Sequence, residues 1–120
     1  MSVDSYSIKS YISGMIKSAI QQKANLLVAI AHSNRIRILE HLRNEFKCNC
    51  ELAPALGLEQ SNLSRHLKIL TQAGVLISWK DGLRVNFKIA DDRIFDILDI
   101  AENIATKGVL VEEHTIQEEV

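Results

Sequence analysis

Proline, glycine, cysteine and aromatic residues are all scarce in this chain of 120 residues, which has 1 Pro, 5 Gly, 2 Cys and 5% aromatic residues. So little proline and glycine excludes a flexible linker or a fibrous repeat, and 47% hydrophobic with 24% charged residues is typical of an ordered globular chain. Two cysteines are too few for a disulfide framework. The length leaves room for one domain with a modest core, which excludes a multidomain enzyme.

Long apolar runs are missing too. The longest, Leu26 to Ala31, is far shorter than the ~20 residues that cross a bilayer, and residues 1–4 lack the basic start of a signal peptide. We therefore expect a cytoplasmic location and no membrane partner. The net charge of −1 hides an asymmetry, because residues 60–90 carry five Lys or Arg against one Asp, and residues 91–120 carry two against nine acidic residues. The basic middle third indicates a polyanionic partner, although a solvated basic face would have the same composition.

Apolar stripes with helical spacing predict a helix near each end, at about 6–22 and at about 92–106, followed by a tail at 108–120. The two helices carry more apolar surface than one small core can cover. We therefore expect a homodimer formed through them. The alternative is that the two helices cover each other within a monomer.

Between these ends, the apolar stretch Leu26 to Ile30 leads to Ser33 and Asn34, either of which can cap a new helix. Asp91 and Asp92 are expected to cap the last helix in the same way.

Two helices joined by a short turn are predicted at about 51–73. Glu51 to Leu56 forms the first, Gly57 is its left-handed end, and Gln60 to Ala73 forms a longer second helix with a leucine face turned inward. This pattern predicts a helix-turn-helix, whose second helix enters the DNA major groove. An ordinary helical hairpin is the alternative.

After this second helix the spacing of apolar residues changes from the helical period to a period of two, which is typical of a strand. Arg84 to Ile89 alternates strictly, Val75 to Trp79 is its expected partner, and Asp81-Gly82 predicts a tight turn with positive φ at both positions. The result is a small β-hairpin, or wing, at about 75–89. The expected fold is mainly α, a single winged helix-turn-helix domain that spans 1–120.

At this point the chain resembles the ArsR/SmtB family of winged-helix repressors, from Leu27 to about Ile104. The resemblance rests on three segments, Ala31 to Leu39, Gly57 to Leu70 and Ala73 to Leu76. The stretch Ser64 to Leu67 is its most specific part. Ser33 stands where the family usually has Pro, and Glu59 where a capping Ser is common. The resemblance implies a dimer that leaves its double-stranded DNA operator when it binds a metal or metalloid.

The resemblance also implies which side chains approach DNA. They are Gln60, Ser61, Asn62, Ser64, Arg65 and His66. Their chemistry agrees, because Gln and Asn pair with adenine, Arg pairs with guanine, and Ser hydroxyls bind phosphate. Lys68 points away from the core, and Lys80 and Arg84 on the wing are expected to contact the DNA backbone or minor groove. A half-buried structural role for His66 is equally consistent with the sequence.

Cys48 and Cys50 precede the helix-turn-helix. Arsenic-sensing members of the family that this chain resembles carry a Cys-x-Cys motif at this place, with a further cysteine close behind it. In this chain the position of that further cysteine is Ala53, which has no thiol. Pro54 disfavours a helix that starts before Glu51, so both thiols should lie on extended backbone and reach one soft ion. An internal disulfide is less expected, since an extended i, i+2 spacing lies at or past the ~6.8 Å limit for bridged Cα atoms. Two inert small hydrophobic residues are the plainer alternative.

Coordination limits the effector. Trivalent arsenic takes three thiolates and the chain offers two, so a third ligand would be external or come from elsewhere in the dimer, whereas two-coordinate ions fit directly. The acidic face of the last helix, Asp92, Asp96 and Asp99, has no His, so the zinc, nickel or cobalt site of some relatives is not expected there. No cofactor is required.

The leading hypothesis is a DNA-binding transcriptional repressor that is released from its operator by a thiophilic metal or metalloid, such as trivalent arsenic, bound at Cys48 and Cys50. A thiol-based redox-sensing repressor and a winged-helix protein-interaction module are the alternatives. An enzyme is not expected, because the chain has no nucleophile, base and orienting group at a known spacing and no phosphate-binding loop.

Overall fold

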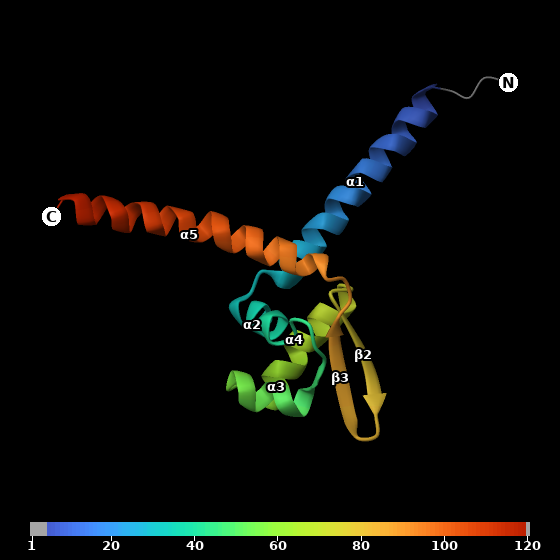
Figure 1. Cartoon of the computed structure of the whole chain (residues 1–120). Helices are drawn as coiled ribbons and strands as arrows, with labels where there is room; N and C mark the ends of the chain where they lie inside the picture. Colours follow the sequence, from blue (N-terminus) through green and yellow to red (C-terminus); the bar gives the residue numbers. More distant parts are fainter. Residues whose placement is uncertain (1–4, 120) are drawn as a thin grey trace.

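The computed structural model describes the backbone of residues 5–119 and the side chains of residues 18–107. In this part of the chain the elements are α1 Ser5–Ile30, α2 Ser33–His41, β1 Lys47–Cys48, α3 Asn49–Leu56, α4 Gln60–Gln72, β2 Leu76–Asp81, β3 Arg84–Ile89 and α5 Arg93–Glu119. The strands form one antiparallel sheet in the order β1-β3-β2. Figure 1 shows α3 and α4 beside the β2–β3 hairpin, which confirms the winged helix-turn-helix fold.

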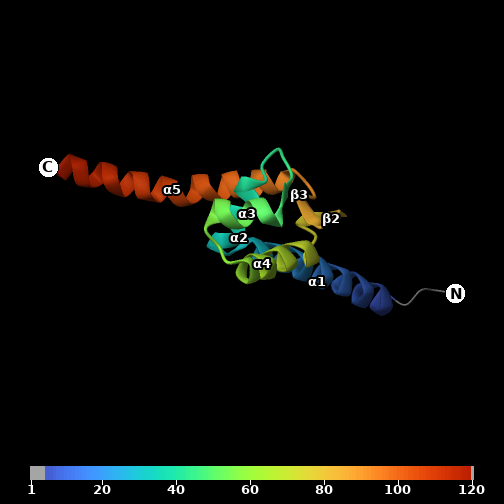
Figure 2. The same cartoon turned by 90° about the horizontal axis from the view of Figure 1, so that it is seen from below.

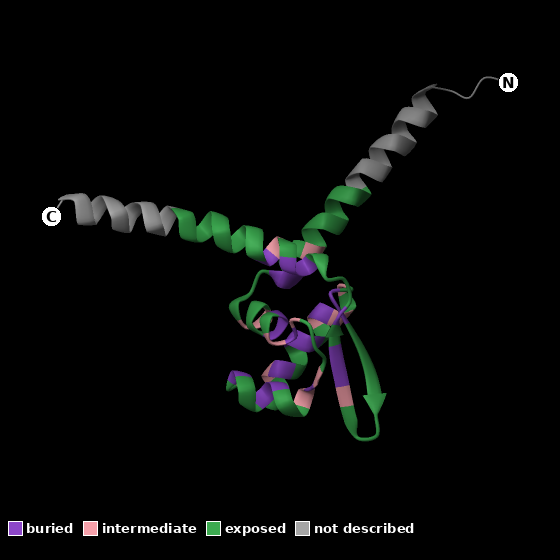
Figure 3. Ribbon diagram, in the orientation of Figure 1, coloured by how far each residue is buried: buried purple, intermediate pink, exposed green. Residues whose placement is uncertain are grey.

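The core lies where α2, α3, α4 and the sheet meet the inner ends of α1 and α5, the purple region of Figure 3. Its fully buried side chains include Leu39, Leu42, Leu52, Leu63, Leu70 and Leu76. The leucine face predicted for α4 is thus inside the protein, and the opposite face of that helix is free. Phe95 of α5 is also buried.

The two long helices leave this core in different directions (Figures 1 and 2). Apolar side chains along both of them are between 51% and 70% exposed; they are Ile20, Leu27, Val28, Ile100 and Ile104. For these residues, the alternative in which the helices cover each other within a monomer is wrong. The apolar residues of the first predicted helix at positions 8, 12, 15 and 16 lie outside the described side chains.

Both terminal helices are longer than predicted. The first runs without a break through Leu26 to Ile30, where a separate segment was expected, because no Pro or Gly interrupts residues 15–30. The last continues past residue 106 to Glu119. His32, and neither Ser33 nor Asn34, is the N-cap of α2, since its Nδ1 accepts a hydrogen bond of 3.1 Å from the Asn34 backbone N–H.

Two other ends follow from local chemistry. Gly57 ends α3 in the left-handed conformation, with φ of 65°, as predicted. In the wing, Asp81 pairs with Arg84, so Gly82 and Leu83 are the two turn residues. Only Gly82 has positive φ, at 63°, which corrects the prediction of positive φ at both Asp81 and Gly82. A turn with glycine first needs positive φ only there.

The start of α5 confirms half of the predicted cap. The Asp91 carboxylate accepts hydrogen bonds from the Arg93 backbone N–H at 2.9 Å and from its guanidinium at 2.6 Å. These hydrogen bonds lower the pKa of Asp91 to about 2. A carboxylate in this place fixes the point at which the chain leaves the sheet and enters α5.

Candidate nucleic-acid interface and cysteine pair

The outer face of α4 presents most of the side chains that were predicted to contact DNA. Leu63, Leu67 and Leu70 anchor the inner face. On the other side the exposed residues are Gln60, Ser61, Ser64, Arg65 and Lys68, and Asn62 is half-buried. Because these residues follow one another around one exposed face, α4 offers amide, hydroxyl, guanidinium and ammonium groups to a single ligand surface.

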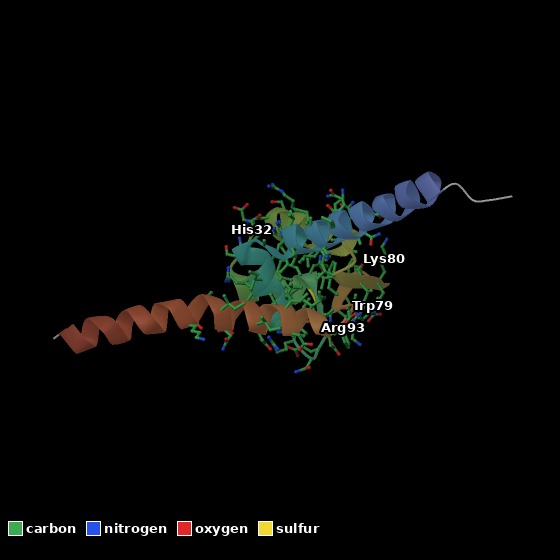
Figure 4. All side chains as sticks on the ribbon, turned by 90° about the horizontal axis from the view of Figure 1, so that it is seen from above. His32, Trp79, Lys80 and Arg93 are labelled. Atoms are coloured by element: carbon green, nitrogen blue, oxygen red, sulfur yellow. A yellow bond between two sulfur atoms is a disulfide. The ribbon has the colours of Figure 1, made fainter. Side chains whose placement is uncertain are left out.

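The wing adds a second group of cations. Lys80 on β2 and Arg84 on β3 are both exposed, and Figure 4 shows Lys80 on the hairpin, well apart from His32. A hollow of about 290 Å³ lies between α4 and the sheet, and Ser64, Lys68 and Ser78 line it together with Asn49 of α3. The start of α3 therefore borders the same surface as α4 and the wing.

His66 is the exception among the predicted contacts. It is 6% exposed, its ring lies 4.5 Å from the ring of His32, and its Nδ1 is 3.3 Å from the Arg35 guanidinium. Burial, together with the nearby charges of His32, Arg35 and Arg65, lowers the pKa of His66. A buried ring that accepts a hydrogen bond from Arg35 favours the structural interpretation of His66 over a DNA contact.

Arg35 joins three helices at this point. Besides His66 on α4, its guanidinium reaches the C-terminal end of α1, where Nε donates to the Ala29 carbonyl at 2.6 Å and Nη2 to the Val28 carbonyl at 3.4 Å. The last carbonyls of a helix have no partner within it, so a cation there satisfies them. One side chain of α2 thus holds α1 and α4 in a fixed relation.

Cys48 and Cys50 are joined by a disulfide, with their Cα atoms 5.2 Å apart. The expectation that an internal disulfide is disfavoured was wrong, because it assumed an extended backbone through both residues. The chain is extended at Cys48 but turns into α3 at Asn49, which brings the two Cα atoms within the range of a disulfide.

The start of α3 also corrects the predicted boundary at Glu51. Cys48 is the N-cap, Cys50 lies in the first turn, and Pro54 is inside the helix. The Glu51 carboxylate accepts a hydrogen bond of 3.3 Å from the Cys48 backbone N–H, which favours the earlier start. Pro54 cannot donate an intrahelical hydrogen bond, and the helix still continues through it to Leu56.

Strand β1 connects the cysteine pair to the wing, and sequence reasoning missed it because two residues carry no detectable period. Cys48 pairs with Asn86 of β3, and Asn86 pairs with Trp79 of β2. These three residues form one row across the sheet. Trp79 in turn packs on Phe46, with ring centroids 5.4 Å apart. The disulfide therefore lies where the wing joins the helix-turn-helix.

A metal site would need side chains that converge within residues 18–107, whose side chains the structure describes. Among them, no group of three or more His, Cys, Asp or Glu residues is placed to hold an ion. On α5, Asp99 pairs with Arg43 at 2.9 Å, so one member of the acidic face holds α5 against the turn that follows α2. Three-thiolate coordination of trivalent arsenic does not fit these residues alone. In addition, none of the described helices is both long and apolar enough to cross a membrane.

Comparison with known proteins agrees with this architecture. Residues 32–78 match the family described as bacterial regulatory protein, arsR family. The uncharacterized HTH-type transcriptional regulator Rv0081 of Mycobacterium tuberculosis is 37% identical over 86 residues, 71% of this chain and 75% of its own length. NmtR, an HTH-type transcriptional regulator of the same organism, is 34% identical over 83 residues, 69% of each chain.

Solved structures give the same result. The crystal structure of Rv0081 superimposes with a TM-score of 0.68 at 35% identity and covers 79% of this chain and 95% of that one. A homodimeric winged helix-turn-helix domain of Mb0332 from Mycobacterium bovis, at 22% identity and a TM-score of 0.70, covers 78% of this chain and 86% of that one and shares the fold. The relatives are regulators, as expected, and not enzymes. The chain belongs to the ArsR family of helix-turn-helix transcriptional regulators.

Proposed function

We propose that this regulator is a homodimeric repressor that binds operator DNA through α4 and the wing, and that the state of the Cys48–Cys50 pair sets its affinity for that DNA. The observation that carries the proposal is the place of the disulfide, at the N-cap of α3 and in the strand row that leads to Trp79. A covalent change there acts on the helix-turn-helix and on the wing together.

Dimerisation is supported by the two divergent helices. Five apolar side chains on α1 and α5 are at least half exposed, and a second copy would remove them from water. A two-fold dimer presents two α4 helices, so its operator is an imperfect palindrome with half-sites about one helical turn, ~34 Å, apart. Lys68, Lys80 and Arg84 give the phosphate contacts that make such binding depend steeply on salt.

Oxidation is the signal that the structure favours for the cysteine pair. In the reaction, two thiols lose two protons to solvent and two electrons to an external small-molecule disulfide, which leaves as two thiolates that take up two protons from solvent. The new bond fixes the angle between β1 and α3. In the reduced chain that angle is free to adjust when α4 and the wing bind DNA. The oxidised dimer cannot make this adjustment, so it binds its operator more weakly.

A two-coordinate thiophilic ion is the second candidate effector, favoured by the close approach of the same two cysteines, whose Cα atoms lie 5.2 Å apart. Such an ion would be held by Cys48 and Cys50 in the reduced form alone. Because the described residues supply two thiols, trivalent arsenic would need a third ligand from outside this set.

The test uses an operator-like duplex selected from a random library by the reduced protein. Fluorescence anisotropy then compares the reduced dimer, the dimer oxidised with glutathione disulfide, and the reduced dimer with mercuric or cuprous ion. We expect oxidation to weaken binding by about 5- to 150-fold, the usual range for coupling between two sites, and dithiothreitol to restore it. Emission from Trp79, the single tryptophan, follows the change at the wing in the same samples.

The matched control is the double variant Cys48→Ser, Cys50→Ser, which should stay folded and bind DNA without responding to either treatment. If an ion weakens binding and oxidation does not, the metal-sensing candidate replaces the redox one. If the double variant still responds, the sensing site lies elsewhere. If the selected library yields no enriched duplex in any state, the protein is an interaction module and the proposal is wrong.

A further inference from the structure

The two sulfur atoms of the disulfide belong to residues in very different surroundings. Cys48 is 1% exposed and is held in β1, paired with Asn86 of the central strand. Cys50 is exposed and lies in the first turn of α3, an eight-residue helix. A reagent from solution therefore meets one of the two residues before the other.

We propose that Cys50 is the reactive thiol, which forms a transient mixed disulfide with a small-molecule thiol, and that Cys48 is the buried thiol that resolves it. The inference rests on the proposed thiol-responsive function and assigns a separate role to each cysteine. It also makes Cys50 a modification site for low-molecular-mass disulfides.

The chemistry of exchange supports this order. Exchange requires that a thiolate and an external disulfide reach each other, so access decides which cysteine reacts first. Cys50 is exposed and Cys48 is 1% exposed, so an external disulfide reaches Cys50 first. The dipole of α3 favours negative charge in the first turn of the helix, where Cys50 lies.

The two steps balance. In oxidation, the Cys50 thiol loses its proton to solvent, and the thiolate attacks an external disulfide, forming a bond to one sulfur and expelling the other as a thiolate. The Cys48 thiol then loses its proton and attacks Cys50 Sγ, which forms the internal disulfide and expels the second external thiolate. The external disulfide accepts two electrons and the protein gives two.

An adduct on Cys50 would also act on the DNA-binding surface. Its neighbour Asn49 lines the hollow that Ser64 and Lys68 of α4 border. Glutathione carries net negative charge, and a negatively charged group at this edge opposes the approach of DNA phosphates. The mixed disulfide should therefore weaken operator binding before the internal disulfide forms.

The first experiment uses the reduced wild-type dimer, so that no substitution disturbs the core. A limiting amount of iodoacetamide is added, and tandem mass spectrometry of the tryptic peptide measures alkylation at each cysteine. We expect Cys50 to be modified about tenfold or more faster than Cys48, as expected for an exposed thiol at a helix N-terminus against a buried one. Equal modification, or a preference for Cys48, overturns the proposal.

The second experiment treats two single variants with glutathione disulfide. Cys48→Ser should accumulate one stable glutathione adduct at Cys50, and Cys50→Ser should react about tenfold or more slowly. Circular dichroism checks that both variants are folded. If one variant is unfolded, the alkylation of the wild-type protein decides which cysteine is the reactive one. Faster adduct formation in Cys50→Ser reverses the two roles. Neither measurement involves DNA, so failure here is distinct from failure of the proposed operator response.

Discussion

Replacing Ile104 with glutamate should dissociate the proposed dimer. Ile104 lies on the free part of α5 and is 70% exposed, and Ile100, one turn earlier on the same face, is 60% exposed. Full burial of an isoleucine side chain contributes roughly 1.5–3 kcal/mol of favourable free energy. Because 70% of Ile104 is exposed, burial of that part in a dimer interface would contribute about 1–2 kcal/mol to the free energy of association. Because a two-fold dimer contains the residue twice, Ile104→Glu should cost about 2–4 kcal/mol, a rise of about 30- to 900-fold in the dissociation constant.

Sedimentation velocity across a concentration series measures this constant directly. Leu83→Glu is the matched control, since Leu83 is 106% exposed at the tip of the wing and is remote from α5 (Figure 1). The control should dimerise like the wild type, while Ile104→Glu should become monomeric at concentrations where the wild type is a dimer. Unchanged dimerisation of Ile104→Glu would show that the exposed face of α5 is not the interface. A wild type that is monomeric at micromolar concentration would refute the reasoning altogether.

Three further predictions concern DNA binding and stability. Arg65→Ala should cost about 1–3 kcal/mol in operator binding and relax the preference at one base position, whereas Lys80→Ala should weaken all sequences alike, as competition assays with altered duplexes will show. The pKa of His66 in the folded protein lies below its ordinary value of 6.5, so the unfolded chain binds the proton more tightly and stability declines as the pH falls below about 6.5. His66→Gln should therefore show a smaller loss of stability between about pH 7.5 and 5.5 in urea denaturation; an identical loss would assign the pH dependence to other groups. Leu52→Ala, at a side chain that is 0% exposed, should cost about 2–5 kcal/mol in the same assay, and a cost below about 1 kcal/mol would contradict its place in the core.

The sequence predicted the fold where a residue pattern has one structural solution. The leucine spacing of α4 determines which face is buried, and Gly57 determines where α3 ends, because both follow from local geometry. Strict alternation located β3 within its observed bounds. The family resemblance was carried by these same segments, so fold and family were confirmed together.

The errors arose where a contact between distant segments decides the structure. Strand β1 exists because Cys48 pairs with Asn86, a partner 38 positions later that no local pattern indicates. His66 on α4 is buried against Arg35 of α2 and against His32, the N-cap of α2. The disulfide was missed since a turn into α3 at Asn49 shortens the distance between two cysteines that an extended chain would hold apart.

The position of Arg35 has a mechanical consequence for reading an operator. A planar guanidinium presents its donors in fixed directions, and here those directions are set by the end of α1 and by His66 on α4. Any rotation of α1 against its counterpart in a dimer would be transmitted as a rotation of the recognition helix. In the proposed dimer, the distance between the two α4 helices would then be set by the contact between the subunits and not by the DNA.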